Sequence, residues 1–176
     1  MRLTTRHLEQ IIAQAKSDAP NETCGLIAGK GGRARKVYAL KNTAPTPRTN
    51  YYADPQELLS CFQDIDAMGL THLAIYHSHP SSPAYPSPTD LAMAYYPDVV
   101  NLIISLMDAS RVIVRAFRIV DKTITEVTLE IEDEYESPRT NSRRALPRAD
   151  RPRAGRPVAA LSKGRPNVRG TRGARR

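Results

Sequence analysis

The sequence contains no tryptophan and only two phenylalanines, so tyrosine provides most of its aromatic side chains. Cysteine is equally scarce: Cys24 and Cys61 can form at most one disulfide bond, which excludes a disulfide-stabilised scaffold and favours reduced thiols. Long hydrophobic runs are missing too. The most apolar stretch, residues 99–107, is interrupted by polar side chains and is too short to span a bilayer. Because the N-terminus also lacks the apolar core of a signal peptide, we expect a cytoplasmic chain that makes no membrane contact.

The formal net charge of +8 comes from one end of the chain. Residues 137–176 hold 12 arginines and one lysine against a single aspartate, whereas residues 1–136 hold 13 basic and 17 acidic side chains. The basic segment has no aromatic residue and almost no large aliphatic one, so it cannot bury enough apolar surface to offset the entropy of ordering. We therefore predict a folded domain, 1–136, and a disordered Arg/Pro/Gly-rich tail, 137–176. Clustered arginines bind phosphates nonspecifically, so the tail is either a weak nucleic-acid contact or a solubilising extension.

The first 136 residues alternate between helix and strand patterns. Apolar residues at helical spacing predict an amphipathic helix over 8–15 with Thr4 or Thr5 as its cap, and Asp54-Pro55 is a strong start for a second helix that ends near Gly69. A third, short helix is expected over 88–96, ended by Pro97. Strands are expected over 24–28, 34–40, 73–79, 100–107, 112–120 and 124–131. This order predicts an α/β fold with a central mixed β-sheet flanked by helices.

The most informative segment is Tyr-His-Ser-His-Pro at the end of the strand predicted over 73–79. Residues i and i+2 of a strand share a face, so His77 and His79 project together, and Pro80 should end the strand and leave the pair at a sheet margin. With Asp90 nearby, two imidazoles and a carboxylate supply three ligands and leave one position open, as in a catalytic zinc site. The alternative for Ser87 and Asp90 is structural: both fit a helix-capping box.

The whole pattern, H-x-H-P-x6-S-x2-D, resembles the motif of the JAMM (MPN+) zinc metallopeptidases, and the resemblance extends over residues 1–131. In that family a glutamate lies upstream, where this sequence has Glu22 in the segment Glu-Thr-Cys-Gly. Taken alone, Glu22 is an ordinary loop carboxylate, and only the resemblance gives it a role. The implied fold is the MPN/JAMM domain, a cytidine-deaminase-like sheet flanked by helices.

The resemblance also implies a role for each residue of the motif. His77, His79 and Asp90 are expected to bind one Zn²⁺, although nickel or iron also suit a site of two histidines and one carboxylate. Glu22 is expected to accept the proton of the attacking water and to deliver it to the leaving amine, and Ser87 to stabilise the oxyanion. Outside the motif, Cys24 is expected to be a core residue. The pairs Tyr51-Tyr52 and Tyr95-Tyr96 are expected to pack against neighbouring side chains, although one of the first pair could line a substrate groove.

Members of this family cleave amide or isopeptide bonds after the C-terminal Gly-Gly of ubiquitin or ubiquitin-like proteins. Here only the segment 80–88 separates the histidine strand from the next helix, which leaves little room for a linkage-selecting insertion. The chain therefore most resembles the bacterial branch that releases cysteine from a ubiquitin-like sulfur-carrier protein, and that carrier is the expected partner, bound as an added strand at the sheet margin.

Several alternatives to this function stay open. One is an isopeptidase, like the deubiquitinases, that acts on ubiquitin-like conjugates. Another is a DNA-repair-associated relative, or a module that binds nucleic acid through the tail alone. A metal-free scaffold of the same fold is disfavoured, because all five motif positions are present. The sequence does not indicate an oligomeric state.

Overall fold

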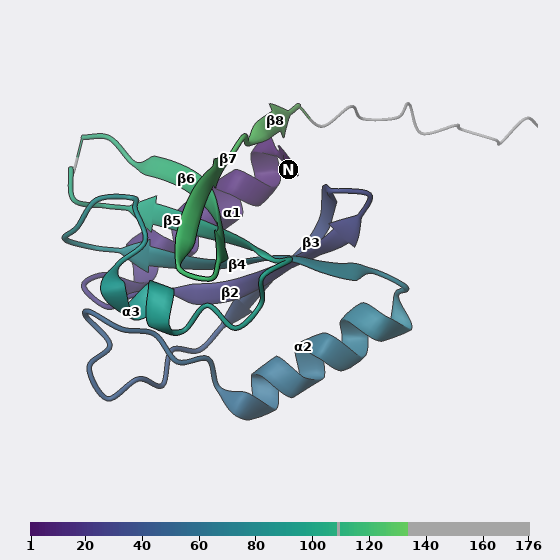
Figure 1. Cartoon of the computed structure of the whole chain (residues 1–176), viewed down its shortest axis with the longest axis horizontal. Helices are drawn as coiled ribbons and strands as arrows, with labels where there is room; N and C mark the ends of the chain where they lie inside the picture. Colours follow the sequence, from purple (N-terminus) through teal and green to yellow (C-terminus); the bar gives the residue numbers. More distant parts are fainter. Residues whose placement is uncertain (109, 134–176) are drawn as a thin grey trace, which may run out of the picture. The chain divides into compact units, whose positions relative to one another are not determined.

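The computed structural model describes residues 1–108 and 110–133. The predicted tail, 137–176, and its boundary with the domain lie outside the described residues and stay predictions. The described part contains three helices and eight strands (Figure 1). The helices are α1 (Thr5–Asp18), α2 (Pro55–Ala67) and α3 (Pro88–Ala92). The strands are β1 (Arg2–Thr4), β2 (Cys24–Lys30), β3 (Arg33–Leu40), β4 (Thr71–His79), β5 (Val100–Ser105), β6 (Ile113–Val120), β7 (Thr123–Val127) and β8 (Glu130–Glu132).

All eight strands belong to one mixed sheet in the order β7-β6-β5-β4-β2-β3-β1-β8. The two end strands of this order, β7 and β8, are separated in sequence only by Thr128 and Leu129. Three Cα–Cα steps reach at most about 10 Å, whereas neighbouring strands are each about 4.8 Å apart. The sheet must therefore curl until its end strands approach each other. This arrangement confirms the predicted mixed sheet flanked by helices.

Helices α1 and α2 cover opposite faces of the sheet (Figure 1). Side chains alternate between the two faces along β2: Ile27 belongs to the core cluster that contains Ile11 and Ala15 of α1, whereas Leu26 packs in the cluster that contains Ile65 of α2. Strands β2 and β5 are buried along almost their whole length, which explains why their sequences are largely apolar. Both helices start at side-chain caps, Thr4 for α1 and Asp54 for α2.

The strand predicted over 124–131 is in fact two strands with different partners. β7 pairs antiparallel with β6, and β8 pairs parallel with β1, where Leu3 lies opposite Ile131. The apolar–polar alternation runs without interruption over residues 126–132, across the junction of the two strands, so periodicity alone could not reveal the break between them. β1 was also missing from the prediction, because three residues are too few to show a period.

The helix predicted over 88–96 is shorter than expected and ends at Ala92. Met93 donates its backbone N–H to Thr89 O as the C-cap, and the N–H of Tyr95 then bonds to Met93 O in a tight turn. The helix therefore ends well before Pro97. This early end matters for the site, because it leaves Tyr95 and Tyr96 on an irregular segment that faces a pocket.

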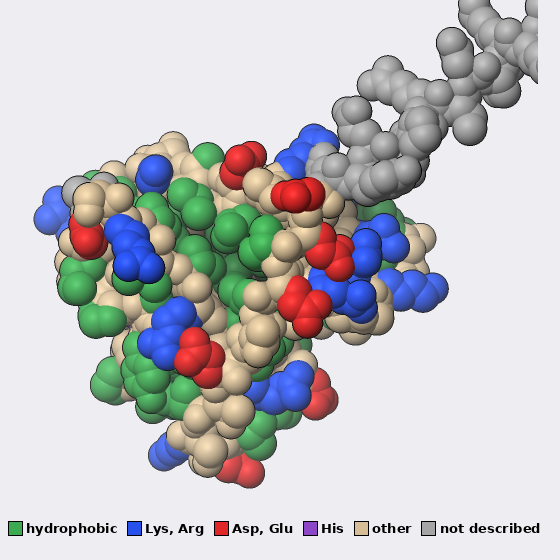
Figure 2. Space-filling model, turned by 90° about the horizontal axis from the view of Figure 1, so that it is seen from above, with side chains coloured by type: hydrophobic (Ala, Val, Ile, Leu, Met, Phe, Trp, Pro, Cys, Tyr) green, Lys and Arg blue, Asp and Glu red, His purple; other side chains and the backbone are tan. Residues whose placement is uncertain are grey.

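Charges of both signs are interspersed on the face of the molecule shown in Figure 2, around a hollow in which hydrophobic side chains gather. Elsewhere in the described residues, as on this face, charges of opposite sign lie near each other: Arg33 pairs with Glu132 at 3.0 Å and Arg115 with Glu126 at 2.7 Å. The described side chains on this face do not form the uniform positive patch that a phosphate backbone attracts. No helix in the described ranges is long and apolar enough to cross a membrane.

Candidate functional site

The two histidines of the sequence motif lie at the C-terminal end of β4, near the middle of the sheet. β4 pairs antiparallel with β2, where His77 lies opposite Cys24, and parallel with β5, where His79 lies opposite Ser105. The expectation of a sheet margin is therefore wrong in one respect. The pair lies where the strand ends, but β4 has partners on both sides, so β4 itself offers no free edge for an added strand.

The side chains of His77, His79 and Asp90 converge on one point. His77 Nε2 lies 3.1 Å from His79 Nε2 and 3.2 Å from Asp90 Oδ1, and His79 Nε2 lies 3.4 Å from Asp90 Oδ2. Ligands about 2.05 Å from a tetrahedral ion are separated by about 3.3 Å, so these distances match a shared metal ion. All three side chains are buried. Among the described residues this trio is the group of His, Cys, Asp and Glu side chains positioned to hold a metal.

Asp90 is oriented by the start of α3. Ser87 Oγ accepts a hydrogen bond from Asp90 N at 3.2 Å, and Ser87 N donates to Asp90 Oδ2 at 2.7 Å. The capping box considered as the alternative is thus present, and the same carboxylate also faces both histidines. Burial raises the pKa of Asp90, but hydrogen bonds with His77 and His79 outweigh it and hold the pKa well below its usual range. The carboxyl is therefore an anion, as a metal ligand must be.

The rings of the two histidines are held in different ways. His79 Nδ1 lies 2.8 Å from Pro83 O, which favours a proton on Nδ1 and leaves Nε2 as the electron-pair donor. Burial lowers the pKa of His79, whereas hydrogen bonds with Asp90 and Pro83 O raise it. The hydrogen bonds outweigh burial, so the pKa of His79 lies above its usual value. His77 Nδ1 is buried and has no hydrogen-bond partner within the described part of the chain. Its ring instead stacks on Tyr51 at a centroid distance of 4.6 Å.

Glu22 lies directly before β2 and is fixed by its main chain. Glu22 N donates to Pro47 O at 2.6 Å, and Glu22 O accepts from Asn42 Nδ2 at 2.8 Å. The next residue is tied to β4, because Thr23 N donates to Ser78 Oγ at 2.8 Å. Burial, with a smaller contribution from the charge of Asp90, raises the pKa of Glu22 from 4.5 to about 7. This carboxyl is therefore able to take up and release a proton near neutral pH.

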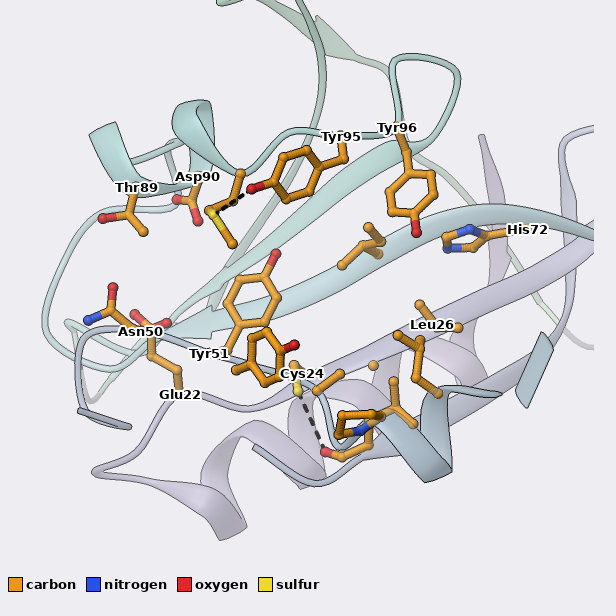
Figure 3. Close-up of a pocket in the computed structure, with 18 of the residues that line it drawn as sticks. Glu22, Cys24, Leu26, Asn50, Tyr51, His72, Thr89, Asp90, Tyr95 and Tyr96 are labelled. Atoms are coloured by element: carbon orange, nitrogen blue, oxygen red, sulfur yellow. Dashed lines mark hydrogen bonds between the residues drawn. The ribbon is translucent and has the colours of Figure 1, made fainter. Parts of the chain in front are cut away.

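A pocket of about 300 Å³ starts at this site and extends between β2, β4 and α2. In Figure 3, Glu22, Asp90 and Asn50 lie at one end and His72 and Tyr96 at the other. Its lining is mostly apolar, from aromatic and aliphatic side chains, among them Leu26, Leu40, Tyr51, Leu58, Phe62, Ile75, Met93 and Tyr95. Such a pocket suits an extended, largely apolar peptide segment.

Sequence reasoning missed Asn42 and Ser78, and it missed the contact of Tyr51 with His77. The expectation that one of the pair Tyr51-Tyr52 lines a groove is confirmed, because both side chains line the pocket. The structure separates the pair: Tyr51 stacks on a motif histidine, whereas Tyr52 is 55% exposed. Cys24 is buried, as expected, and its raised pKa of about 12, mainly due to burial, keeps it a thiol.

Comparisons with known proteins show what this chain is similar to. A family described as prokaryotic homologues of the JAB domain matches residues 4–120. The chain is 34% identical over 127 residues to the CysO-cysteine peptidase of Mycobacterium tuberculosis, a match that covers 71% of this chain and 86% of the relative. It is 45% identical over 87 residues to the probable TtuB-protein conjugate cleaving protease of Thermus thermophilus, which covers 49% of this chain and 58% of that protein.

Solved structures show the same architecture. Protein DSY2949 from Desulfitobacterium hafniense matches with a TM-score of 0.69 at 33% identity and covers 77% of this chain and 94% of its own. AF2198, a JAB1/MPN domain protein from Archaeoglobus fulgidus, matches with a TM-score of 0.51 at 20% identity and covers 75% of this chain and 97% of its own. The latter likeness concerns the fold alone.

Proposed function

We propose that this chain cleaves the bond that follows the C-terminal Gly-Gly of a ubiquitin-like protein. The chain belongs to the family of prokaryotic homologues of the JAB domain, the JAMM metallopeptidases. It is a hydrolase of this family. The finer proposal is that the bond is the amide between a sulfur-carrier protein and cysteine. The observation that carries the proposal is the convergence of His77, His79 and Asp90 beside a buried glutamate whose pKa is near neutrality.

The metal that fits this donor set is Zn²⁺, held by His77 Nε2, His79 Nε2 and the carboxylate of Asp90. Two neutral imidazoles and one carboxylate leave a position open for water or substrate, which a closed structural site lacks. When bound, Zn²⁺ supplies Lewis acidity: it polarises the scissile carbonyl and makes water a nucleophile near neutral pH.

Glu22 provides the proton transfer in the proposed reaction. In the metal-free chain, burial raises the pKa of this carboxyl well above its usual range, and a carboxyl of this kind is suited to accept the proton of the attacking water and to give it back to the departing amine. Its backbone is held from three directions, by Pro47, Asn42 and the Thr23–Ser78 bond, so the side chain starts from a fixed position. Proton transfer requires such positioning within hydrogen-bond reach.

Ser87 is suited to stabilise the negative charge that develops on the carbonyl oxygen. Its Oγ already accepts a hydrogen bond from Asp90 N, so the hydroxyl hydrogen remains free to be donated. A donor fixed before the reaction begins costs no reorganisation in the transition state.

The pocket suits the end of a ubiquitin-like tail. Two glycines before the scissile bond let the backbone approach the metal ligands closely, because they carry no Cβ. The residues before them would enter the apolar part of the pocket, along Tyr51 and towards Phe62. Because β4 has no free edge, the side-chain pocket rather than strand addition to β4 provides the recognition in this proposal.

The size of the leaving group separates two candidate functions. The segment between β4 and α3 is short and folded back on the site: Pro83 O contacts His79, and Ala84 is buried against Ile103 and Phe117. It presents no additional loop to hold a second ubiquitin-like domain, which favours a small leaving group such as cysteine. The second candidate is an isopeptidase acting on protein conjugates, favoured by the 45% identity to a relative named as a conjugate-cleaving protease.

Three substrates offered under equal conditions test the proposal, with products followed by mass spectrometry: a carrier–cysteine adduct, the same adduct with its penultimate glycine changed to valine, and lysine-linked diubiquitin. We expect efficient release of cysteine from the first and a large loss of kcat/KM with the second. Cleavage of diubiquitin but of no carrier adduct would contradict the cysteine proposal and support the isopeptidase. Inertness towards all three would contradict both.

A further inference from the structure

The imidazole of His77 is the least supported of the three proposed metal ligands in terms of hydrogen bonds. A ligating histidine normally donates its second ring N–H to a nearby acceptor, which fixes the ring plane. His79 has this support from Pro83 O at 2.8 Å. His77 Nδ1, in contrast, is buried without a hydrogen-bond partner in the described residues. Another contact must therefore orient the ring of His77.

That contact is the ring of Tyr51. The centroids of the two rings lie 4.6 Å apart and their planes differ by 23°, which is a stacked arrangement. A stacked ring restricts rotation of the imidazole about its χ2 bond, because rotation would drive one ring into the other. His77 itself is fully buried, so the ring has little other freedom once Tyr51 is in place.

Tyr51 is in turn held by a loop that Asn42 fixes. The amide of Asn42 donates to Glu22 O at 2.8 Å and to Asn50 O at 3.0 Å, and its Oδ1 accepts from Tyr52 N at 3.0 Å. These bonds bind the backbone on both sides of Tyr51. Thr43 adds two more bonds to Tyr52 O, from its N–H at 2.7 Å and its hydroxyl at 3.0 Å.

We propose that Tyr51 is a positioning residue for the metal centre: its ring, held by the loop that Asn42 fixes, orients the imidazole of His77 in place of a hydrogen bond to Nδ1. This inference rests on the proposed function, because it needs His77 to be a zinc ligand. It assigns Tyr51 no contact with the reacting atoms. The role belongs to the aromatic ring and not to the hydroxyl group, which makes it separable by substitution.

The test measures the zinc affinity of the full-length chain by competition with a chromogenic chelator, without any activity assay. Tyr51→Leu removes the ring and should weaken zinc binding about tenfold or more, the usual cost of losing support behind a metal ligand. Tyr51→Phe keeps the ring and should bind within about threefold of wild type. Tyr52→Leu is the matched control, because Tyr52 is a neighbouring tyrosine that lines the same pocket but is 55% exposed.

Each outcome decides the inference. Wild-type affinity in Tyr51→Leu, or an equal loss in Tyr51→Phe or Tyr52→Leu, overturns it. If Tyr51→Leu fails to fold, Asn42→Asp decides in its place, since it removes the amide donors to Glu22 O and Asn50 O. Unchanged zinc affinity in Asn42→Asp then overturns the inference. If wild type itself binds no zinc, the proposed function is wrong. If wild type binds zinc tightly and Tyr51→Leu binds it equally tightly, only the inference about Tyr51 is wrong.

Discussion

A Glu22→Gln variant should lose activity and gain stability, because the same burial that tunes the carboxyl for proton transfer also disfavours its charge. Glutamine keeps the shape of the side chain but is unable to act as a base. Loss of a positioned proton-transfer group typically costs about 10²–10⁴-fold in rate. Zinc content should remain that of wild type, since Glu22 is not one of the three proposed ligands.

The gain in stability follows from the raised pKa. Glu22 is 6% exposed and its pKa is about 7 instead of 4.5. At about 1.36 kcal/mol per pKa unit, the charged carboxyl destabilises the folded metal-free chain by at most about 3 kcal/mol. Because the folded chain favours the protonated form, wild type loses stability relative to the variant as the pH rises from 4.5 towards about 7, and the difference stays constant above that.

The assay is chemical denaturation of chelator-treated protein at two pH values. The variant should exceed wild type by about 1 kcal/mol near pH 5.5 and by about 3 kcal/mol near pH 8. Glu9→Gln, on the exposed side of α1, is the control and should change the free energy of unfolding by less than about 0.5 kcal/mol at either pH. A variant that is no more stable than wild type at pH 8 would refute the claim that Glu22 is buried at an energetic cost.

Three further predictions follow from the structure and the sequence. Ser87→Ala should lower kcat about 10²-fold with little change in KM, because the hydroxyl donor acts on charge that develops in the transition state. Steady-state kinetics measure both constants, and an effect on KM alone would contradict the assignment. Ser78→Ala should lower the free energy of unfolding by about 1–3 kcal/mol, since it leaves the buried N–H of Thr23 without its acceptor. Its melting temperature is the readout, and an unchanged value would exclude the bond as a significant tie. Deletion of residues 137–176 should leave the melting temperature and the rate on a small substrate unchanged, because the segment lacks the apolar content to join a core, and a clear drop would show that it does.

The local part of the site was accessible from the sequence because short-range geometry determines it. The i, i+2 spacing places His77 and His79 on one face of a strand whatever the rest of the fold does. Likewise, Ser87-Pro88 starts a helix whose third residue, Asp90, turns back towards its N-cap. The distance of His79 from Asp90, by contrast, depends on how the connecting segment packs, and only the structure provides it.

The other contributions depend on contacts between distant segments, which carry no periodic signal. Glu22 lies 55 positions before His77 and reaches the site through the antiparallel pairing of β2 with β4. Tyr51 comes from an irregular loop whose course depends on the side chain of Asn42. The strands β1 and β8 are three residues each and pair only because the sheet curls. Single-sequence patterns describe neither loop course nor sheet curvature.

The most direct test of the central claim relates metal content to turnover. Chelator-treated enzyme is titrated with Zn²⁺, and cysteine release from a carrier adduct is followed by mass spectrometry beside the zinc bound. We expect activity to be absent without metal and to rise in proportion to bound zinc up to one ion per chain, with Asp90→Asn unable to recover it. Cysteine release by fully chelated enzyme, or full activity in Asp90→Asn, would contradict a metal centre at His77, His79 and Asp90.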